Sequence, residues 1–442
     1  MNIQLSDSFT YKKLLKFTFP SIIMMIFTSI YGVVDGIFVS NFAGKTPFAA
    51  INLIMPVFLI IGALGFMIGT GGSALVARYL GEGRKEKANR TFSMLIYVSL
   101  VFSVIISVLG FIFIKPIAGF LGAEGEMLRC CVLYGKILLP PMFAFILQNE
   151  FQAFMIVAEK PHIGLWVTVF AGVTNIVLDA LFVGLFHWGL AGAAVATAMS
   201  QLVGGIIPLL YFIFSKEAPL KLCKAKMDFK DLLKACTNGS SEMMTNISMS
   251  LVTILYNFQL MRFSGENGIA AYGVIMYVAF IFISIFIGYC VGSSPIISFH
   301  FGAQNHKELR KLLKMSLVII GIFSVAMTIF SIFLAKPLSQ IFVGYDEELL
   351  SITVRGFIIY CFSFLLAGFN IFASSFFTAL NDGLVSAVIS FLRTLLFQVL
   401  SVMILPIFLK LDGIWFSIIV AELLSLSAVI IFIKKMQPKY KY

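Results

Sequence analysis

Two acids and two neutral oxygen donors stand inside stretches that are otherwise apolar. Asp35 interrupts SIYGVVDGIFVSN, Asn175 and Asp179 are four apart in TNIVLDALFV, and Thr197 lies in GAAVATAMS. Residues four apart share one face of a helix, so Asn175 and Asp179 project together. Carboxylate, amide and hydroxyl oxygens can hold a monovalent cation, and two nearby acids can share a proton. Alternatively, the four groups hydrogen-bond to one another and hold three helices together.

The elements that carry these residues set them at a common depth. Apolar runs at about 14–39 and 163–186 are predicted to run outward and the run at 190–214 inward. At ~1.5 Å per residue, all four side chains fall about 6–17 Å below the outer surface. No basic residue stands at that depth in these runs to neutralise the acids. This favours a coupling-ion site, for H⁺ or Na⁺, over a structural cluster.

Composition predicts an all-α polytopic membrane protein. The chain is 60% hydrophobic and 12% charged, whereas soluble domains carry about 25% charged residues. Twelve apolar runs are long enough to cross a hydrocarbon layer of about 30 Å, and their continuous hydrophobicity favours helices over barrel strands. The predicted spans are 14–39, 52–76, 93–114, 133–156, 163–186, 190–214, 237–261, 270–298, 312–335, 355–379, 384–408 and 413–433.

Basic residues predict the orientation. With a cytoplasmic N-terminus, 23 Lys and Arg residues fall on the cytoplasmic side and 8 on the outer side. This bias predicts a multi-pass protein of the cell membrane with both termini in the cytoplasm. The net charge of +11 therefore follows from topology, and we expect no nucleic-acid partner.

The chain is predicted to be a duplication with a constant offset of 221 residues. Gly44 matches Gly265, Lys115-Pro116 match Lys336-Pro337, and Asn149 matches Asn370. Each half has six helices, which predicts two bundles related by a pseudo-two-fold along the membrane normal, as in transporters with parallel repeats. The predicted domains are an N-terminal lobe at 1–214, a cytoplasmic linker with an amphipathic helix at 215–236, and a C-terminal lobe at 237–442.

The repeat breaks at the polar residues described first. At the same offset the second half carries Tyr256, Leu396, Leu400 and Ile418 in place of Asp35, Asn175, Asp179 and Thr197. The predicted ion site therefore belongs to the N-terminal half alone.

From Tyr11 to Lys435 the sequence resembles the multidrug and toxic compound extrusion (MATE) transporters. The resemblance rests on VVDGIFVSNFAG, GTGGSALVARYLGEGRKEKA, NIVLDALFV and GLAGAAVATAMSQ, while SSEMMTNIS is similar to the MepA/DinF-like branch. It implies an N-lobe cation site formed by Asp35, Asn175, Asp179 and Thr197, with the Ala193 carbonyl as a further ligand. The C-lobe acid of another branch is absent from LLAGFNIFASS, so no second ion site is expected there.

Other residues yield separate predictions. Pro20 removes a backbone hydrogen bond and is a candidate hinge in helix 1, or else a static kink. Glu242 either attracts cationic substrate or complements the helix 7 dipole. Glu150 and Glu422 are expected to pair with Lys160 or Arg393. Because methionine and aromatic side chains suit promiscuous sites, the predicted substrate cleft also includes Met55, Met276 and Tyr277.

Together these features predict a monomeric secondary active transporter that exports small organic, mostly cationic, compounds through the lipid bilayer against H⁺ or Na⁺. The alternative is a lipid-linked oligosaccharide flippase, but helices 1, 2, 7 and 8 lack the internal Lys or Arg expected for an anionic substrate. No charge ring or carbonyl filter motif favours a channel. No cofactor is expected, and no nucleophile–base or metal motif indicates an enzyme.

Overall fold

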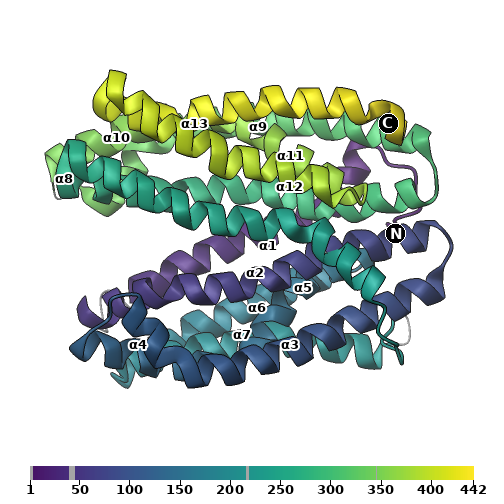
Figure 1. The fold of residues 1–442 in the computed structure, drawn as a ribbon, viewed down its shortest axis with the longest axis horizontal. Coiled ribbons are helices and arrows are strands. Elements are labelled where there is room, and N and C mark those ends of the chain that lie inside the picture. The colour runs from purple at the N-terminus through teal and green to yellow at the C-terminus, as the bar shows by residue number, and fades with distance from the viewer. Residues whose placement is uncertain (1–2, 39–44, 216–218, 345) are drawn as a thin grey trace.

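The chain folds into two bundles of helices. The computed structural model describes residues 3–38, 45–215, 219–344 and 346–442. The N-terminal bundle contains α1 to α7 and the C-terminal bundle contains α8 to α13, and Figure 1 shows them lying along each other. Both termini lie at one end of the molecule (Figure 1), here called the terminal end, and the opposite end is called the distal end.

The N-terminal bundle alternates long helices with one broken helix pair. α4 and α5 meet at 62° around two adjacent prolines, Pro140 and Pro141, because a proline cannot donate the backbone hydrogen bond that would continue the helix. The elements are α1 (Tyr11–Phe38), α2 (Lys45–Gly81), α3 (Lys85–Phe120), α4 (Gly125–Leu138), α5 (Met142–Val157), α6 (Pro161–Asp179), the π-helix η2 (Ala180–Leu185) and α7 (Gly189–Phe214).

The C-terminal bundle repeats this order. Its elements are α8 (Phe229–Gly302), α9 (His306–Val343), α10 (Glu347–Cys361), α11 (Phe364–Ala379), α12 (Gly383–Phe391), the π-helix η3 (Leu392–Leu396) and α13 (Phe397–Tyr440). α8 is broken at Gly265 (φ 58°) and α13 at Lys410 (φ 51°), so each label covers two helical arms. The second arm of α8, 266–302, repeats α2 at an offset of 221 residues, and α10 and α11 meet at 51°.

The described helices are those of a membrane protein. Eight are long and apolar enough to cross a membrane, and ten if each bent pair counts as one span. With the arms of α8 and α13 counted separately, the described chain passes along the bundles twelve times, as the sequence predicted. On α3, Val101, Val104 and Val108 are more than half exposed, a pattern that suits contact with lipid.

The two bundles meet backbone to backbone near the terminal end. An added Cβ at Gly81 of α2 would lie 2.0 Å from the carbonyl oxygen of Phe299 on α8, and one at Gly239 would lie 1.8 Å from that of Met67. The Ser298 hydroxyl of α8 also donates to the carbonyl of Ala74 on α2. Only glycine allows such close approach, so the closure at this end depends on the absence of side chains.

Candidate ion and substrate sites

The register of α7 on α6 places the first set of predicted residues together. The Ser200 hydroxyl donates a 2.8 Å hydrogen bond to the carbonyl of Ala171, and a Cβ on Gly192 would lie 3.0 Å from the Cβ of Phe182. The helices are therefore antiparallel neighbours. Between these two contacts, equal rise along both helices sets Thr197 level with Asn175, and Ala193 level with Asp179 at the end of α6. The residues brought to this level are Asn175, Asp179, Ala193 and Thr197.

This level of the N-terminal bundle is buried and polar. Asn175 is 2% exposed, Asp179 0% and Ala193 1%. Among the described residues, the Asn175 amide nitrogen and the Thr197 hydroxyl have no hydrogen-bond partner. Buried polar atoms are normally paired, so donors and acceptors remain available here for a small ligand. The buried Gln201 amide oxygen, one turn from Thr197, likewise has no hydrogen-bond partner among the described residues. Gln201 was not predicted from the sequence, although its spacing of four residues from Thr197 could have indicated that both face the same side of α7.

α1 packs against the same part of α6. A Cβ on Gly172 would lie 2.5 Å from the Phe27 ring and 3.1 Å from the Tyr31 ring. Both helices run toward the distal end, and residue 35 stands one turn beyond Tyr31 on α1. Its backbone therefore reaches the level of Asn175. The Asp35 side chain itself lies outside the described part of the structure.

Two local features of the backbone adjoin this level. α6 changes into the π-helix η2 directly after Asp179, and π-helical turns are frequent at functional sites. Pro20 lies inside the continuous helix α1. Next to it, α1 is in backbone contact with α8, since a Cβ on Gly288 would lie 2.5 Å from the Ile22 Cα. The hinge role of Pro20 stays a prediction.

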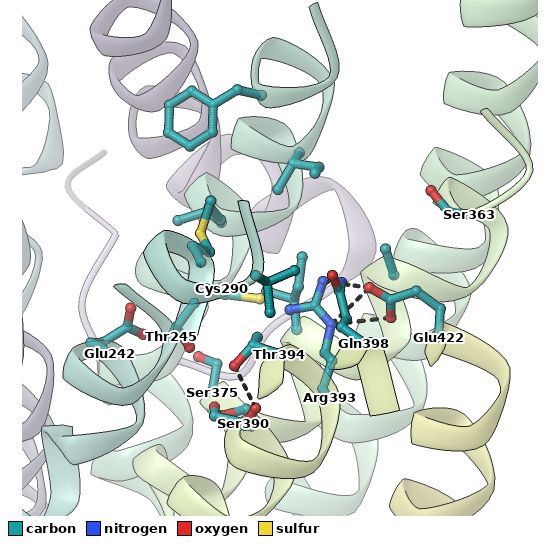
Figure 2. A pocket seen from close by; sticks show the side chains of 18 of the residues that line it. Glu242, Thr245, Cys290, Ser363, Ser375, Ser390, Arg393, Thr394, Gln398 and Glu422 are labelled. Atoms are coloured by element: carbon teal, nitrogen blue, oxygen red, sulfur yellow. Dashed lines mark hydrogen bonds and ion pairs between the residues drawn. The ribbon is translucent and has the colours of Figure 1, made fainter. Parts of the chain in front are cut away.

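A second site is a cavity of about 180 Å³, here called the C-terminal cavity, that is lined mostly by the C-terminal bundle and closed on one side by Thr70, Ser73 and Ala153 of the N-terminal bundle. Figure 2 shows its polar residues converging from α8, α11, α12, η3 and α13, with Glu242 and Glu422 on opposite sides of Arg393. Few of the polar lining residues were predicted from the sequence. Those it missed include Thr245, Ser374, Ser375, Ser390, Thr394 and Gln398. The spacing of Ser386, Ser390 and Thr394 at every fourth residue could have marked one helix face as polar.

Arg393 and Glu422 form the central ion pair of this cavity. Arg393 Nη2 lies 2.8 Å from Glu422 Oε1, and its Nε lies 2.9 Å from the same oxygen and 3.1 Å from Oε2. Asn370 donates to Oε2 at 2.6 Å. The predicted pairing of Glu422 with Arg393 is confirmed. No such pair joins Glu150 to Lys160 among the described residues, and the fully buried Glu150 instead packs its backbone against Gly69 of α2.

The four residues predicted to line a substrate cleft separate into two pairs. Glu242 and Met276 line the C-terminal cavity. Met55 packs against the hydrophobic core of the N-terminal bundle, and Tyr277 is 50% exposed. Neither of the latter two lines that cavity. Their roles toward substrate stay predictions.

Paired multi-helix bundles with buried polar sites fit the architecture of a membrane transporter built from parallel repeats. The model of the family described as MatE matches the chain twice, over residues 20–181 and 243–404. The chain belongs to the MatE family, whose members are multidrug efflux transporters. The two matches also agree with an internal duplication.

Similar proteins agree with this assignment. Over 427 residues the chain is 25% identical to the multidrug export protein MepA of Staphylococcus aureus strain MSSA476, covering 95% of this chain and 93% of the relative. It is 28% identical over 325 residues to MepA of Staphylococcus haemolyticus strain JCSC1435, covering 73% and 72%. The fold matches a structure described as the outward-facing conformation of a multidrug resistance MATE family transporter, with a TM-score of 0.93 and 22% identity over 98% of this chain and 97% of that one.

Proposed function

We propose that this protein exports small organic cations across the cell membrane in exchange for H⁺ or Na⁺ that moves inward. The observation that carries the proposal is the buried Asp179 at the level of Asn175 and Thr197, in a bundle whose neighbouring helix α1 brings residue 35 to that level. A carboxylate at this depth is costly unless it is paired, protonated or bound to a cation, and intramembrane acids often mark ion pathways. Amide and hydroxyl oxygens beside it supply further ligands for either ion.

The charge of the C-terminal cavity supports a cationic substrate. Glu242 and Glu422 contribute two carboxylates, and Arg393 contributes one guanidinium. Arg393 is paired with Glu422, so the half-buried Glu242 supplies the excess negative charge. A monovalent organic cation would balance it, and Met249, Met276 and Tyr272 offer adaptable apolar contacts to a range of shapes.

α1 is suited to couple the two sites because it packs against both bundles. It contacts α6, which carries Asn175 and Asp179, and it also contacts α8, which lines the C-terminal cavity. Ion and substrate then act by favouring different arrangements of the bundles and need not touch each other. In this proposal the lobes are residues 1–214 and 237–442, joined by the cytoplasmic linker 215–236, and the protein acts as a monomer with both termini in the cytoplasm.

An ion-jump experiment on proteoliposomes tests the proposal. A Na⁺ gradient and a pH gradient are imposed separately, and uptake of a fluorescent organic cation is followed. At least one gradient should drive accumulation in the wild-type protein and fail to do so in Asp179→Asn. Accumulation by the variant equal to that of the wild type would overturn the ion-site assignment. An absence of transport under both gradients in the wild type would overturn secondary coupling to these ions.

A further inference from the structure

The two bundles differ at one pair of equivalent surfaces near the terminal end. In the N-terminal bundle, the chain segment before α8 covers one face of α3. The Lys221 N–H donates to the Asn89 side chain at 3.0 Å, the Cys223 N–H donates to Ser93 Oγ at 2.9 Å, and the Tyr97 hydroxyl donates to the Cys223 carbonyl at 3.2 Å. This face of α3 is therefore covered by hydrogen-bonded chain.

The equivalent face of α9 carries cations. At the repeat offset of 221, Asn89, Ser93 and Tyr97 correspond to Arg310, Lys314 and Val318. The face opens onto a groove of about 710 Å³ between the start of α1 and the start of α9. Its lining consists of Thr10, Tyr11, His306, Lys307, Arg310, Lys311, Lys314 and Met315.

Much of this positive charge has no counter-charge nearby. Lys311 is 3.4 Å from the Glu308 carboxylate, and Arg310 donates to the carbonyl of Lys441 at 3.1 Å. Glu308 is itself buried and accepts the Phe9 N–H at 2.7 Å, so it faces the N-terminal segment. The exposed Lys307 and Lys314 make no ion pair among the described residues. The groove therefore attracts an anion.

An apolar stripe continues from the cations along α9. Val318, Ile322, Val325 and Ile329 follow Lys314 at intervals of three or four residues, and they are 48%, 62%, 50% and 51% exposed. Such spacing sets them on one face. The surface thus presents cations near the helix start and then exposed hydrocarbon along the membrane-spanning part, which is the polarity of a phospholipid with its headgroup at the membrane surface.

We infer that this groove binds the headgroup of an anionic phospholipid. Its phosphate lies among Lys307, Arg310 and Lys314, and an acyl chain follows the Val318–Ile329 stripe. A bound lipid contacts α1 of one bundle and α9 of the other, so it stabilises the arrangement in which the bundles meet at the terminal end. The inference does not depend on the transported substrate or on the coupling ion.

Thermal unfolding of the purified full-length protein in a neutral detergent tests this inference. Added phosphatidylglycerol should raise the Tm of the wild type, because a ligand that binds the folded state stabilises it, and phosphatidylcholine at the same concentration should raise it less. In Lys307→Gln/Lys314→Gln the phosphatidylglycerol shift should fall by at least half. Lys226→Gln/Lys230→Gln, which removes two exposed lysines elsewhere at the terminal end, should keep the full shift.

Three outcomes would overturn the site. The first is a full Tm shift in the groove variant, and the second is a loss in the control variant as large as in the groove variant. The third is that inorganic phosphate reproduces the Tm shift without lipid. The Tm of each variant in phosphatidylcholine reports whether it folds. Native mass spectrometry of the wild type is a second test that needs no variant, and equal occupancy by the two lipids at matched concentration would also contradict the inference.

Discussion

The Ser200 hydroxyl donates a 2.8 Å hydrogen bond to the carbonyl of Ala171, and this contact sets the register in which α7 packs on α6. Through it, Thr197 comes level with Asn175, and Ala193 level with Asp179. Ser200 is not a candidate ion ligand, yet its hydrogen bond positions the residues that are. A site held by such packing keeps its geometry when one ligand is changed, and charge can be tested separately from structure.

The aspartates give the first prediction. Asp35→Asn and Asp179→Asn remove a charge while keeping size and hydrogen bonding, so each should express normally and lose gradient-driven efflux. Equilibrium substrate binding should survive better than transport. Thr197→Ala, which removes one neutral ligand, should weaken apparent ion affinity by only about threefold to tenfold, the value of a single hydrogen bond. Proteoliposome transport and substrate binding on the same preparations measure these effects.

The repeat supplies matched controls for this prediction. Tyr256→Phe and Leu400→Ala change the positions equivalent to Asp35 and Asp179 and should leave coupling intact, although either can reduce stability. If a well-expressed Asp35→Asn protein still concentrated substrate against a gradient, Asp35 would be a structural residue. Loss of coupling in a control would argue against a site confined to the N-terminal bundle.

The Arg393–Glu422 pair gives the second prediction. Glu422 is 1% exposed, so Arg393→Met should leave a buried carboxylate without its positively charged partner and cost about 3 kcal/mol or more. Arg393→Met/Glu422→Leu should recover most of that stability, since burial of an ion pair is itself costly. Thermal unfolding of both single variants and the double variant measures the coupling. Additive losses in the double variant would show that the two side chains do not stabilise each other.

The glycine contacts give the third prediction. Gly81→Ala places a methyl group 2.0 Å from the Phe299 carbonyl oxygen, so α2 and α8 must separate near the terminal end. Spin labels at Lys85 and Lys307 should report a longer or broader distance distribution. Gly273→Ala is the control, because a Cβ there meets no atom within 4 Å. An unchanged distribution in Gly81→Ala would mean that the backbone contact does not hold the bundles together.

Glu159 gives the fourth prediction. Burial raises the pKa of Glu159 above its usual value, and the Leu5 N–H, which donates to its carboxylate at 2.8 Å, offsets part of that rise. Its contribution to stability is therefore present at low pH and lost as pH rises through the folded-state pKa. The Tm of Glu159→Gln relative to wild type should increase between about pH 4.5 and 8. Glu86→Gln, at a side chain that is 80% exposed, should show no such trend.

Orientation gives the fifth prediction. The bias in basic residues requires that a cysteine at Gly344 be labelled from outside intact cells and that one at Lys224 be labelled only after permeabilisation. Both positions are exposed, so folding does not hide either from a membrane-impermeant maleimide. The reverse pattern of accessibility would contradict cytoplasmic termini.

Helices were predictable from the sequence because each span is a long apolar run that ends at charged or turn residues. The offset of 221 residues aligns α2 with residues 266–302 in the structure. Only Glu242 and Met276 of the C-terminal cavity were predicted as cleft residues, since its lining comes from segments far apart in the sequence. Residue type alone suggested Met55 and Met276 for one cleft, but in the structure Met276 lines the C-terminal cavity and Met55 packs against the hydrophobic core of the N-terminal bundle. Pairing of Glu422 with Arg393 was predictable because an unpaired charge inside the membrane is costly, so opposite charges there usually pair with each other.

The glycine-mediated contacts between α2 and α8 at the terminal end affect the free energy needed to separate the two bundles during a transport cycle. Backbone carbonyls meeting glycines bury few long side chains and immobilise few rotamers, so separating them releases little ordered structure and exposes little apolar area. Two arrangements of the bundles can then lie within a few kcal/mol of each other. Reversing a 1:99 population ratio takes only about 5.5 kcal/mol of differential binding. In the proposed exchange, binding of one ion together with one substrate can supply a bias of that size.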